Sequence, residues 1–145
     1  MELKTFEYKD YVLWKTMHRV PRVLSGAGHG MAGIAEALYA AADVCGDDSY
    51  VAAANDALAY EIDVWHWYVD KFGTWADLRE FPPTKYMHGY CAGAPGTGIV
   101  LNRLVGMPGV DERVKTVAGL AHEAVERLPL NAYDHLCCGN SAIVE

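Results

Sequence analysis

Three cysteines of this chain stand in glycine-rich turns that are far apart along the sequence. Cys137 and Cys138 are adjacent near the C-terminus, and Cys91 lies in an earlier turn. Thiolates are soft ligands that suit zinc, and three protein ligands leave the fourth tetrahedral position open for an exchangeable ligand. The sequence therefore predicts a catalytic zinc site with Cys91, Cys137 and Cys138 as its ligands.

Simpler interpretations of the cysteines remain open at this point. A Cys-Cys pair at the start of a helix often belongs to buried packing rather than to a metal site. A vicinal disulfide between Cys137 and Cys138 does not fit a reducing compartment. Cys45 lies on an alanine-rich face of a predicted helix, and we expect it in the core.

Three further polar residues are candidates for roles around these sulfurs. His29 stands just before a predicted helix, whose dipole favours the neutral imidazole, and it is our candidate general acid or base. Helix capping or packing is an equally good interpretation of His29. His88 and Asp134 flank the cysteines in sequence and could orient them from a second layer, although surface positions fit them as well.

Composition narrows the class of protein. With 145 residues, 52% of them apolar and 21% charged, the chain suits one globular domain. A formal charge of −7 without clustered Lys or Arg argues against a nucleic-acid surface. No apolar run is long enough for a membrane span, and the charged first twenty residues do not resemble a secretory signal. Four cysteines without such a signal favour a reducing cytoplasm.

Apolar residues recur at helical spacing over most of the chain, and the class is predicted to be all-α. Residues 1–24 are expected to be an irregular lead-in with at most one helical turn, and 73–94 a long loop. The helix–short loop–helix rhythm suggests stacked antiparallel pairs. The predicted helices run from Met31 to about Val44, from an N-cap at Asp48 to about Lys71, from just after Pro95 to about Val105, from a cap at Asp111 to before Pro129, and from Gly139 onward.

A faint internal repeat links the candidate residues. The segments GHGMAGI at 28–34, CAGAPGT at 91–97 and CCGNSAI at 137–143 share one frame: one or two special residues, Gly, two residues, then Gly or Ala. In helical repeats, equivalent turns often lie on one face. The frame would then bring His29 and the three cysteines into one pocket. Alternatively, the glycines merely allow helices to begin close to their neighbours.

The chain resembles the lanthionine synthetase C-like family, and more closely the cyclase domain of class II lanthipeptide synthetases. Three motifs carry the resemblance in order: SGAGHGMAGIA at 25–35, YCAGAPGTG at 90–98 and HLCCGN at 135–140. AYE at 59–61 and WADLR at 75–79 resemble the stretch that those enzymes carry between the first two motifs. The resemblance begins at about residue 24 and extends to the end of the chain.

The resemblance implies a fold, a cofactor and a reaction. The family fold is an α/α toroid of helix pairs with zinc at one mouth of the channel. Its reaction joins a cysteine thiol of a dehydrated precursor peptide to dehydroalanine or dehydrobutyrine, and His29 has the place of the family's acid or base. Residues 1–145 would then be a partial cyclase domain, truncated at both ends, with a fused dehydratase possible in the parent protein. Such a fragment should expose apolar faces and self-associate.

This chain departs from the family pattern at the site itself. The third motif commonly reads Cys-His-Gly, whereas here it reads Cys137-Cys138-Gly139, an all-cysteine version found in some class II enzymes. Ala92 and Tyr90 also replace the usual neighbours of the first ligand, so the role of those side chains is in doubt. Two other functions stay open: a relative that adds a small thiol such as glutathione, and a non-catalytic structural-zinc or peptide-interaction module with a fourth ligand from His29 or His135.

Overall fold

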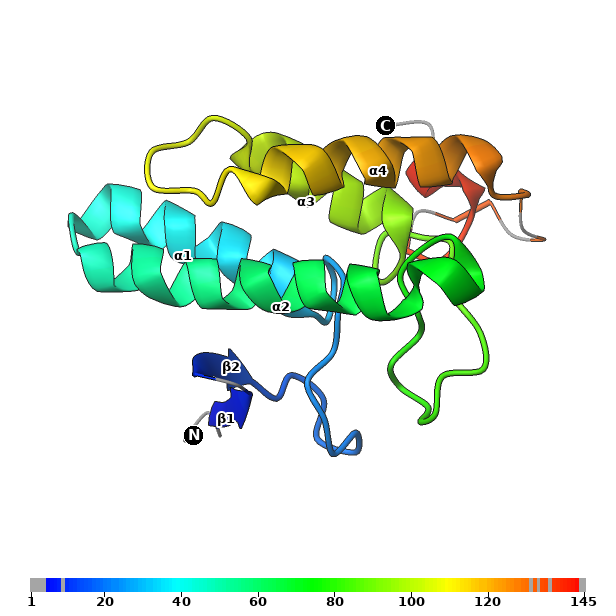
Figure 1. Cartoon of the computed structure of the whole chain (residues 1–145), viewed down its shortest axis with the longest axis horizontal. Helices are drawn as coiled ribbons and strands as arrows, with labels where there is room; N and C mark the ends of the chain where they lie inside the picture. The colour runs from blue at the N-terminus through cyan, green and yellow to red at the C-terminus, as the bar shows by residue number, and fades with distance from the viewer. Residues whose placement is uncertain (1–4, 9, 131, 133, 136, 144–145) are drawn as a thin grey trace.

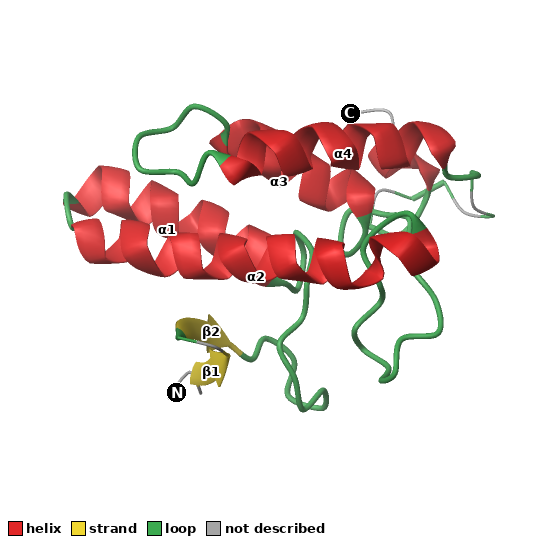
Figure 2. Ribbon diagram, in the orientation of Figure 1, coloured by secondary structure: helices red, strands yellow, loops and turns green. Residues whose placement is uncertain are grey.

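The computed structural model describes residues 5–143 apart from 9, 131, 133 and 136. Two antiparallel helix pairs are stacked in it, as Figure 1 and Figure 2 show. The first pair is α1 (Met31–Cys45) with α2 (Asp48–Phe72), and the second is α3 (Ala94–Leu104) with α4 (Arg113–Arg127). Contacts between α1 and α3 and between α2 and α4 join the two pairs. The all-α class and the pairing of antiparallel helices are confirmed.

Local chemistry sets the ends of the first helix pair. Gly46 and Gly73 adopt left-handed φ angles of 65° and 66°, and their N–H groups bond the last turns of α1 and α2. The carboxylate of Asp47 accepts a hydrogen bond from the N–H of Ser49 at 2.9 Å. The N-cap of α2 is therefore Asp47, and the prediction of Asp48 was wrong by one residue.

The second pair follows the sequence pattern more loosely. Pro95 lies in the first turn of α3, where a missing N–H costs no helical hydrogen bond. Asp111 accepts a hydrogen bond from the N–H of Arg113 at 2.9 Å, as a capping side chain would, although the helix proper begins at Arg113. The expected fifth helix appears as a 3₁₀ turn, η1 (Asn140–Ile143).

The lead-in is not wholly irregular, because it contains a β-hairpin. Strands β1 (Thr5–Tyr8) and β2 (Tyr11–Trp14) pair antiparallel with Tyr8 opposite Tyr11. The hairpin lies against α2, where Leu13 is fully buried. The N–H of Val12 also donates to the carboxylate of Asp56 at 3.1 Å. The expectation of a loop was wrong here, because a four-residue strand is too short to display a clear alternation.

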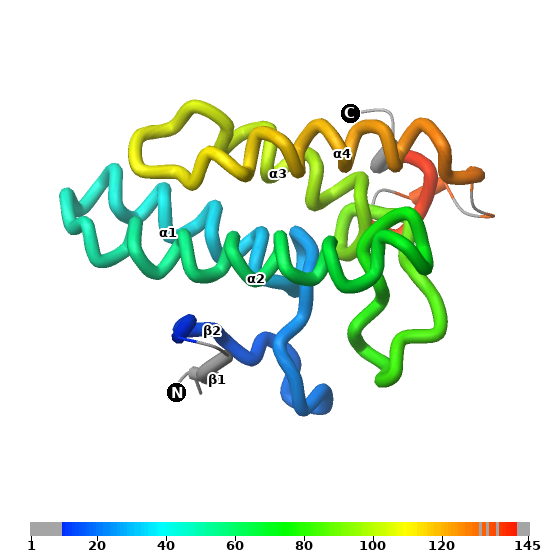
Figure 3. The backbone as a smooth tube through the Cα atoms, in the orientation of Figure 1, coloured from blue at the N-terminus to red at the C-terminus, as the bar shows by residue number. Residues whose placement is uncertain are grey.

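After the hairpin, the chain runs past α2 and enters α1 (Figure 3). The segment from Gly73 to Gly93 folds over the end of α2 and is held there by the fully buried Trp75. The ring of Trp75 packs on Trp65 with centroids 4.6 Å apart, and its Nε1–H donates to the carbonyl of Glu61 at 3.1 Å. This packing fixes the long loop that carries the second glycine-rich turn. No helix in the described part of the chain is long and apolar enough to cross a bilayer.

Candidate metal centre

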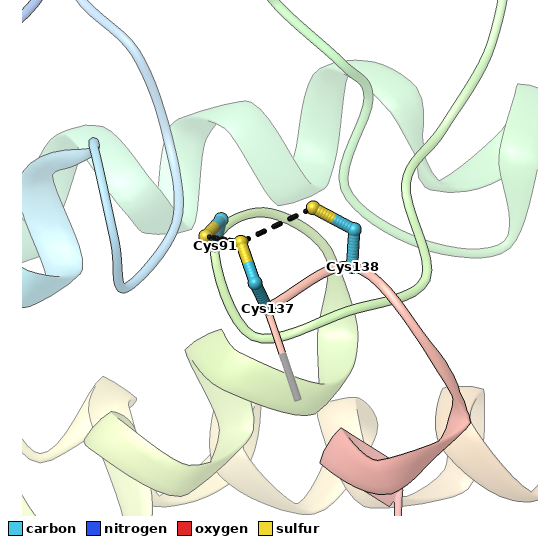
Figure 4. A group of neighbouring side chains, drawn as sticks. All are labelled: Cys91, Cys137 and Cys138. Atoms are coloured by element: carbon cyan, nitrogen blue, oxygen red, sulfur yellow. Dashed lines mark hydrogen bonds between the residues drawn. The ribbon is translucent and has the colours of Figure 1, made fainter. Parts of the chain in front are cut away.

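Three turns that are distant in sequence meet at one end of the helix pairs. The N–H of Gly28 donates to the carbonyl of Cys91 at 3.2 Å, and the N–H of Cys91 donates to the carbonyl of Cys137 at 3.0 Å. Figure 4 shows Cys91 in the loop before α3, beside Cys137 and Cys138 from the C-terminal segment. The glycine-rich turns that share the repeat frame therefore do lie side by side.

Glycine is required where these turns touch. A Cβ at Gly89 would lie 2.5 Å from the Cα of Cys138 and 2.8 Å from the carbonyl oxygen of Cys137. A Cβ at Gly28 would lie 2.9 Å from the Cα of Cys91. Both approaches are closer than carbon atoms tolerate. The glycines let the backbones come near enough for the three cysteine side chains to converge.

The three sulfur atoms form one cluster. The Sγ atom of Cys137 lies 2.7 Å from that of Cys91 and 3.2 Å from that of Cys138, and all three lie within 4.8 Å of one another. These separations exceed the ~2.05 Å of a disulfide bond. Ligands about 2.3 Å from a tetrahedral zinc ion would be about 3.8 Å apart, so small side-chain movements would admit the ion. The donor set fits zinc, because all three atoms are soft sulfurs on tightly packed turns.

Hydrogen bonding between the thiols polarises the cluster. Burial, followed by the hydrogen bond with Cys137, raises the pKa of Cys91 to about 12. The hydrogen bond with Cys137, followed by burial, also raises the pKa of Cys138. The pKa of Cys137 is lowered, first by its hydrogen bond with Cys91 and then by that with Cys138. Negative charge therefore collects first on the central sulfur, where a divalent cation would neutralise it.

His29 lies at the same end of the molecule as the sulfurs. It is exposed in the turn that leads into α1, and it lines a small pocket together with Cys91. Its carbonyl oxygen accepts a hydrogen bond from the hydroxyl of Thr16, which ties the turn to the lead-in. The structure thus brings the predicted acid or base to the candidate metal centre. Its catalytic role stays a prediction.

The two predicted supporting residues occupy different environments. His88 is buried beside the second turn, and burial lowers its pKa. Asp134 is exposed, and its carboxylate accepts from the side-chain amide of Asn140 at 2.9 Å. Asp134 therefore braces the turn after Cys138. Neither residue belongs to the group of metal-ligating side chains found among the described residues.

Cys45 is exposed at the end of α1, so its predicted place in the core was wrong. The helix ends at this residue, and residues 43–46 are all exposed to solvent. The three other cysteines are the ones that cluster. This separation leaves Cys45 as a natural internal control for experiments on the site.

Sequence reasoning gave no role to the buried carboxylate of Glu61, which holds the His29 turn. Its Oε1 atom accepts from the N–H groups of Gly26 and Ala32, both at 2.8 Å, and the side chain is fully buried. Burial raises the pKa of Glu61 to about 8, against the opposing effect of the backbone N–H donors. Glu61 positions the first turn from the middle of α2. A buried acid at a helical core position was the signal that could have pointed to it.

Asp77 and Arg79 were also missed, although they lie in the stretch that carried the resemblance. Asp77 is 2% exposed, and the guanidinium of Arg79 donates to its two carboxylate oxygens at 2.8 and 2.7 Å. Both residues line the pocket that contains His29 and Cys91. A buried carboxylate paired with a partly exposed guanidinium inside a long loop is a feature that packing alone does not require.

Gly89→Ala is expected to separate the second and third turns, because the added methyl group meets backbone rather than a flexible side chain. We expect zinc affinity, measured by competition with a chromophoric chelator, to fall by at least about tenfold. Gly119→Ala is the matched control, because a Cβ on this exposed residue of α4 has no neighbour within 4 Å. It should keep zinc affinity and raise stability by about 0.5–1 kcal/mol. Equal zinc affinity in both variants would contradict the close packing of the turns.

Comparison with known proteins is consistent with this geometry. A family model described as lanthionine synthetase C-like protein matches residues 5–145. No curated protein and no solved structure matches the chain.

Proposed function

The chain belongs to the lanthionine synthetase C-like protein family, and on that premise we propose that it carries the zinc site of a lanthipeptide cyclase. The reaction would add a cysteine thiol of a dehydrated precursor peptide to dehydroalanine or dehydrobutyrine, giving a thioether ring. The observation that carries the proposal is the cluster formed by the sulfurs of Cys91, Cys137 and Cys138.

Zinc held by these three thiolates would ionise a peptide thiol at the remaining coordination position. A free thiol with a pKa of ~8.5 is only a few per cent ionised at pH 7, so full ionisation contributes roughly 30-fold, or ~2 kcal/mol. Holding the thiol and the alkene in attack geometry can supply several kcal/mol more. The backbone hydrogen bonds that join the turns of Cys91 and Cys137 suit that second requirement.

His29 is the proposed proton carrier. The thiol loses its proton, sulfur bonds to Cβ of the dehydro residue, and the alkene electron pair moves toward the carbonyl oxygen. Cα then takes up a proton, which restores the carbonyl group. His29 is exposed and lines the pocket with Cys91, so its imidazole can accept the thiol proton and return it to Cα.

The cluster argues for catalysis over the structural-zinc alternative. A structural site needs a fourth protein ligand. Among the residues that the structure describes, no His, Asp or Glu joins the three sulfurs. The Nδ1 atom of His135, one of the two proposed fourth ligands, instead accepts a hydrogen bond from the N–H of Cys138 at 3.2 Å. A relative that adds glutathione would use the same three sulfurs, and only substrate assays separate it from a peptide cyclase.

The wider setting of the reaction follows from the same premise. We expect a dehydrated precursor peptide as the partner and a reducing cytoplasm, which keeps the three thiols available for zinc. A fused dehydratase domain in the parent protein and self-association of this chain also stay predictions. Light scattering at micromolar concentration tests the last of these, and a monodisperse monomer would contradict it.

The proposed reaction can be assayed with a peptide that contains one cysteine and one dehydroalanine. Ring closure leaves the mass unchanged, so the readout is the loss of a thiol that N-ethylmaleimide can alkylate. We expect the zinc-loaded chain to accelerate this loss, and His29→Asn to slow it by roughly 10²–10⁴-fold.

His122→Asn is the matched control, because His122 is an exposed residue of α4 that faces Glu126 at 3.5 Å. It should react at the rate of the unaltered chain. No acceleration by the zinc-loaded chain would contradict the proposed function. A rate unchanged by His29→Asn would remove His29 from the mechanism.

A further inference from the structure

Arg79 presents a fixed positive charge at the candidate metal centre. Its Nε and Nη2 atoms donate to Asp77 at 2.8 and 2.7 Å, and its main-chain N–H donates to the same carboxylate at 3.1 Å. Nη2 also lies 2.6 Å from the Sδ atom of Met87. Asp77 is itself anchored, because its N–H donates to the carbonyl of Lys85 at 3.0 Å. A guanidinium held through both Nε and Nη2 has little freedom to move.

The guanidinium lies near the sulfurs. Arg79 lines the pocket that also contains His29 and Cys91. The pKa of Arg79 is raised first by its hydrogen bonds to Asp77, and further by the charges of Cys138 and Cys91. Of the described residues that line this pocket, Arg79 is the one with a permanent positive charge.

Part of the guanidinium is available to a ligand. The Arg79 side chain is 42% exposed, whereas the Asp77 side chain behind it is 2% exposed. None of the hydrogen bonds among the described residues uses Nη1 of Arg79. The buried carboxylate thus fixes the guanidinium from one side and leaves donors on the other.

We propose that Arg79 is an oxyanion-binding group of the site, which holds the carbonyl oxygen of the dehydro residue while sulfur adds to its Cβ. The inference rests on the proposed function and deepens it. As the S–Cβ bond forms, the alkene π pair becomes the Cα=C π bond of an enolate and the carbonyl π pair moves to oxygen, whose negative charge the guanidinium stabilises. Cα then gains a proton and the carbonyl reforms, while Arg79 stays protonated throughout.

The three-thiolate ligand set makes the Arg79 guanidinium more important here than it would be at a zinc site with no net charge. Three thiolates on a divalent cation carry a net charge of −1, and a substrate thiolate makes it −2. Developing negative charge on a carbonyl oxygen nearby is therefore disfavoured. A preorganised cation counters that cost without reorganising during the reaction.

The competing interpretation is that Asp77 and Arg79 only brace the long loop.

The first test reads the charge at the sulfurs without any cyclase activity. The reduced chain, with EDTA present, is alkylated by iodoacetate and by iodoacetamide, and mass spectrometry gives the rate at each cysteine. The two reagents attack the same thiolate, so their rate ratio reports the local potential. Arg79→Gln should lower the ratio of iodoacetate to iodoacetamide roughly threefold to tenfold at the clustered cysteines. The ratio at Cys45 should stay constant.

Arg127→Gln is the control for removal of a cation, because Arg127 forms an exposed pair with Glu123 on α4. It should leave every ratio unchanged. Arg79→Lys should recover the ratio at the site. An unchanged ratio in Arg79→Gln would overturn the proposal, whatever the activity of that variant.

The second test uses cyclisation kinetics. With equal zinc content, Arg79→Gln should lower kcat by about 10²-fold with a smaller change in KM. Arg79→Lys should recover only part of kcat, because lysine lacks the planar fork. If kcat falls only in proportion to lost zinc or lost folded protein, Asp77 and Arg79 merely brace the long loop, and the proposal is overturned. If the unaltered chain has no cyclase activity while the alkylation ratio falls as expected, the anion site stands and the proposed function fails.

Discussion

Cys91→Ala is expected to abolish stoichiometric zinc binding. Apparent binding energies of about 10–16 kcal/mol for four-ligand structural sites correspond to about 2.5–4 kcal/mol per ligand. Loss of one of three thiolates should therefore weaken zinc binding by at least about 10²-fold. Cys91 also lies next to Cys137 at 2.7 Å, so the remaining vicinal pair cannot enclose the ion from a second side. Chelator competition with the reduced chain measures the change.

Cys45→Ala is the matched control for that experiment. Cys45 is exposed at the end of α1 and does not belong to the sulfur cluster. Its removal should leave both zinc stoichiometry and zinc affinity unchanged. If Cys91→Ala and Cys45→Ala bind zinc alike, the ion is held elsewhere and the proposed centre is wrong.

Glu61→Ala is expected to be the most destabilising single change outside the cysteines. It would leave the N–H groups of Gly26 and Ala32 without their acceptor and open a cavity where a fully buried side chain had been. Each unsatisfied buried donor costs about 1–3 kcal/mol, and the cavity adds to this. We expect a loss of about 3 kcal/mol or more in urea unfolding at pH 7. A loss below about 1 kcal/mol would contradict this account of Glu61.

Glu61→Gln separates the shape of this side chain from its charge. Glutamine keeps an oxygen that can accept from Gly26 and Ala32, so its cost should be about 1.5 kcal/mol or less. It should also keep the His29 turn in place, and with it any activity that depends on His29. Glu61→Gln therefore shows whether the hydrogen bonds, rather than the ionisable group, hold the turn.

The pKa of Glu61 adds a pH dependence to the stability of the fold. Burial raises this pKa from 4.5 to about 8, so the folded chain binds the proton more tightly than the unfolded chain does. The contribution of Glu61 to stability is therefore complete below pH 4.5 and is lost as the pH rises toward 8. The free energy of unfolding of Glu61→Gln should depend less on pH across that window. Parallel profiles for the two proteins would contradict the raised pKa.

Much of the helical framework could be predicted because its signals are local. Gly46 and Gly73 end helices through their own backbone conformation, and Asp47 caps α2 through a hydrogen bond two residues away. The hairpin escaped prediction because each strand has only four residues, and burial of Leu13 against α2 is a tertiary effect. The exposure of Cys45 also depends on where neighbouring helices end, which no local pattern reveals.

The sequence predicted that the three cysteines come together, but it did not predict the residues that support their turns. The repeated glycine frame pointed to Cys91, Cys137 and Cys138, and glycines of the first two turns do permit close backbone approaches. Glu61 and Asp77 escaped because their partners are backbone groups or a neighbouring guanidinium, whose positions only the fold determines. His88 and Asp134 were chosen by sequence proximity to the cysteines, and proximity along the chain did not place them among the metal-ligating side chains.

X-ray absorption at the zinc edge tests the central claim most directly. The reduced chain is loaded with one equivalent of zinc, and the ligands of the ion are counted and measured. We expect three sulfur ligands at about 2.3 Å and one lighter, exchangeable ligand. Addition of a thiol peptide should convert this spectrum to one with four sulfurs. A spectrum that keeps four protein ligands and does not respond to the thiol, or one that is unchanged by Cys91→Ala, would contradict an open three-cysteine centre.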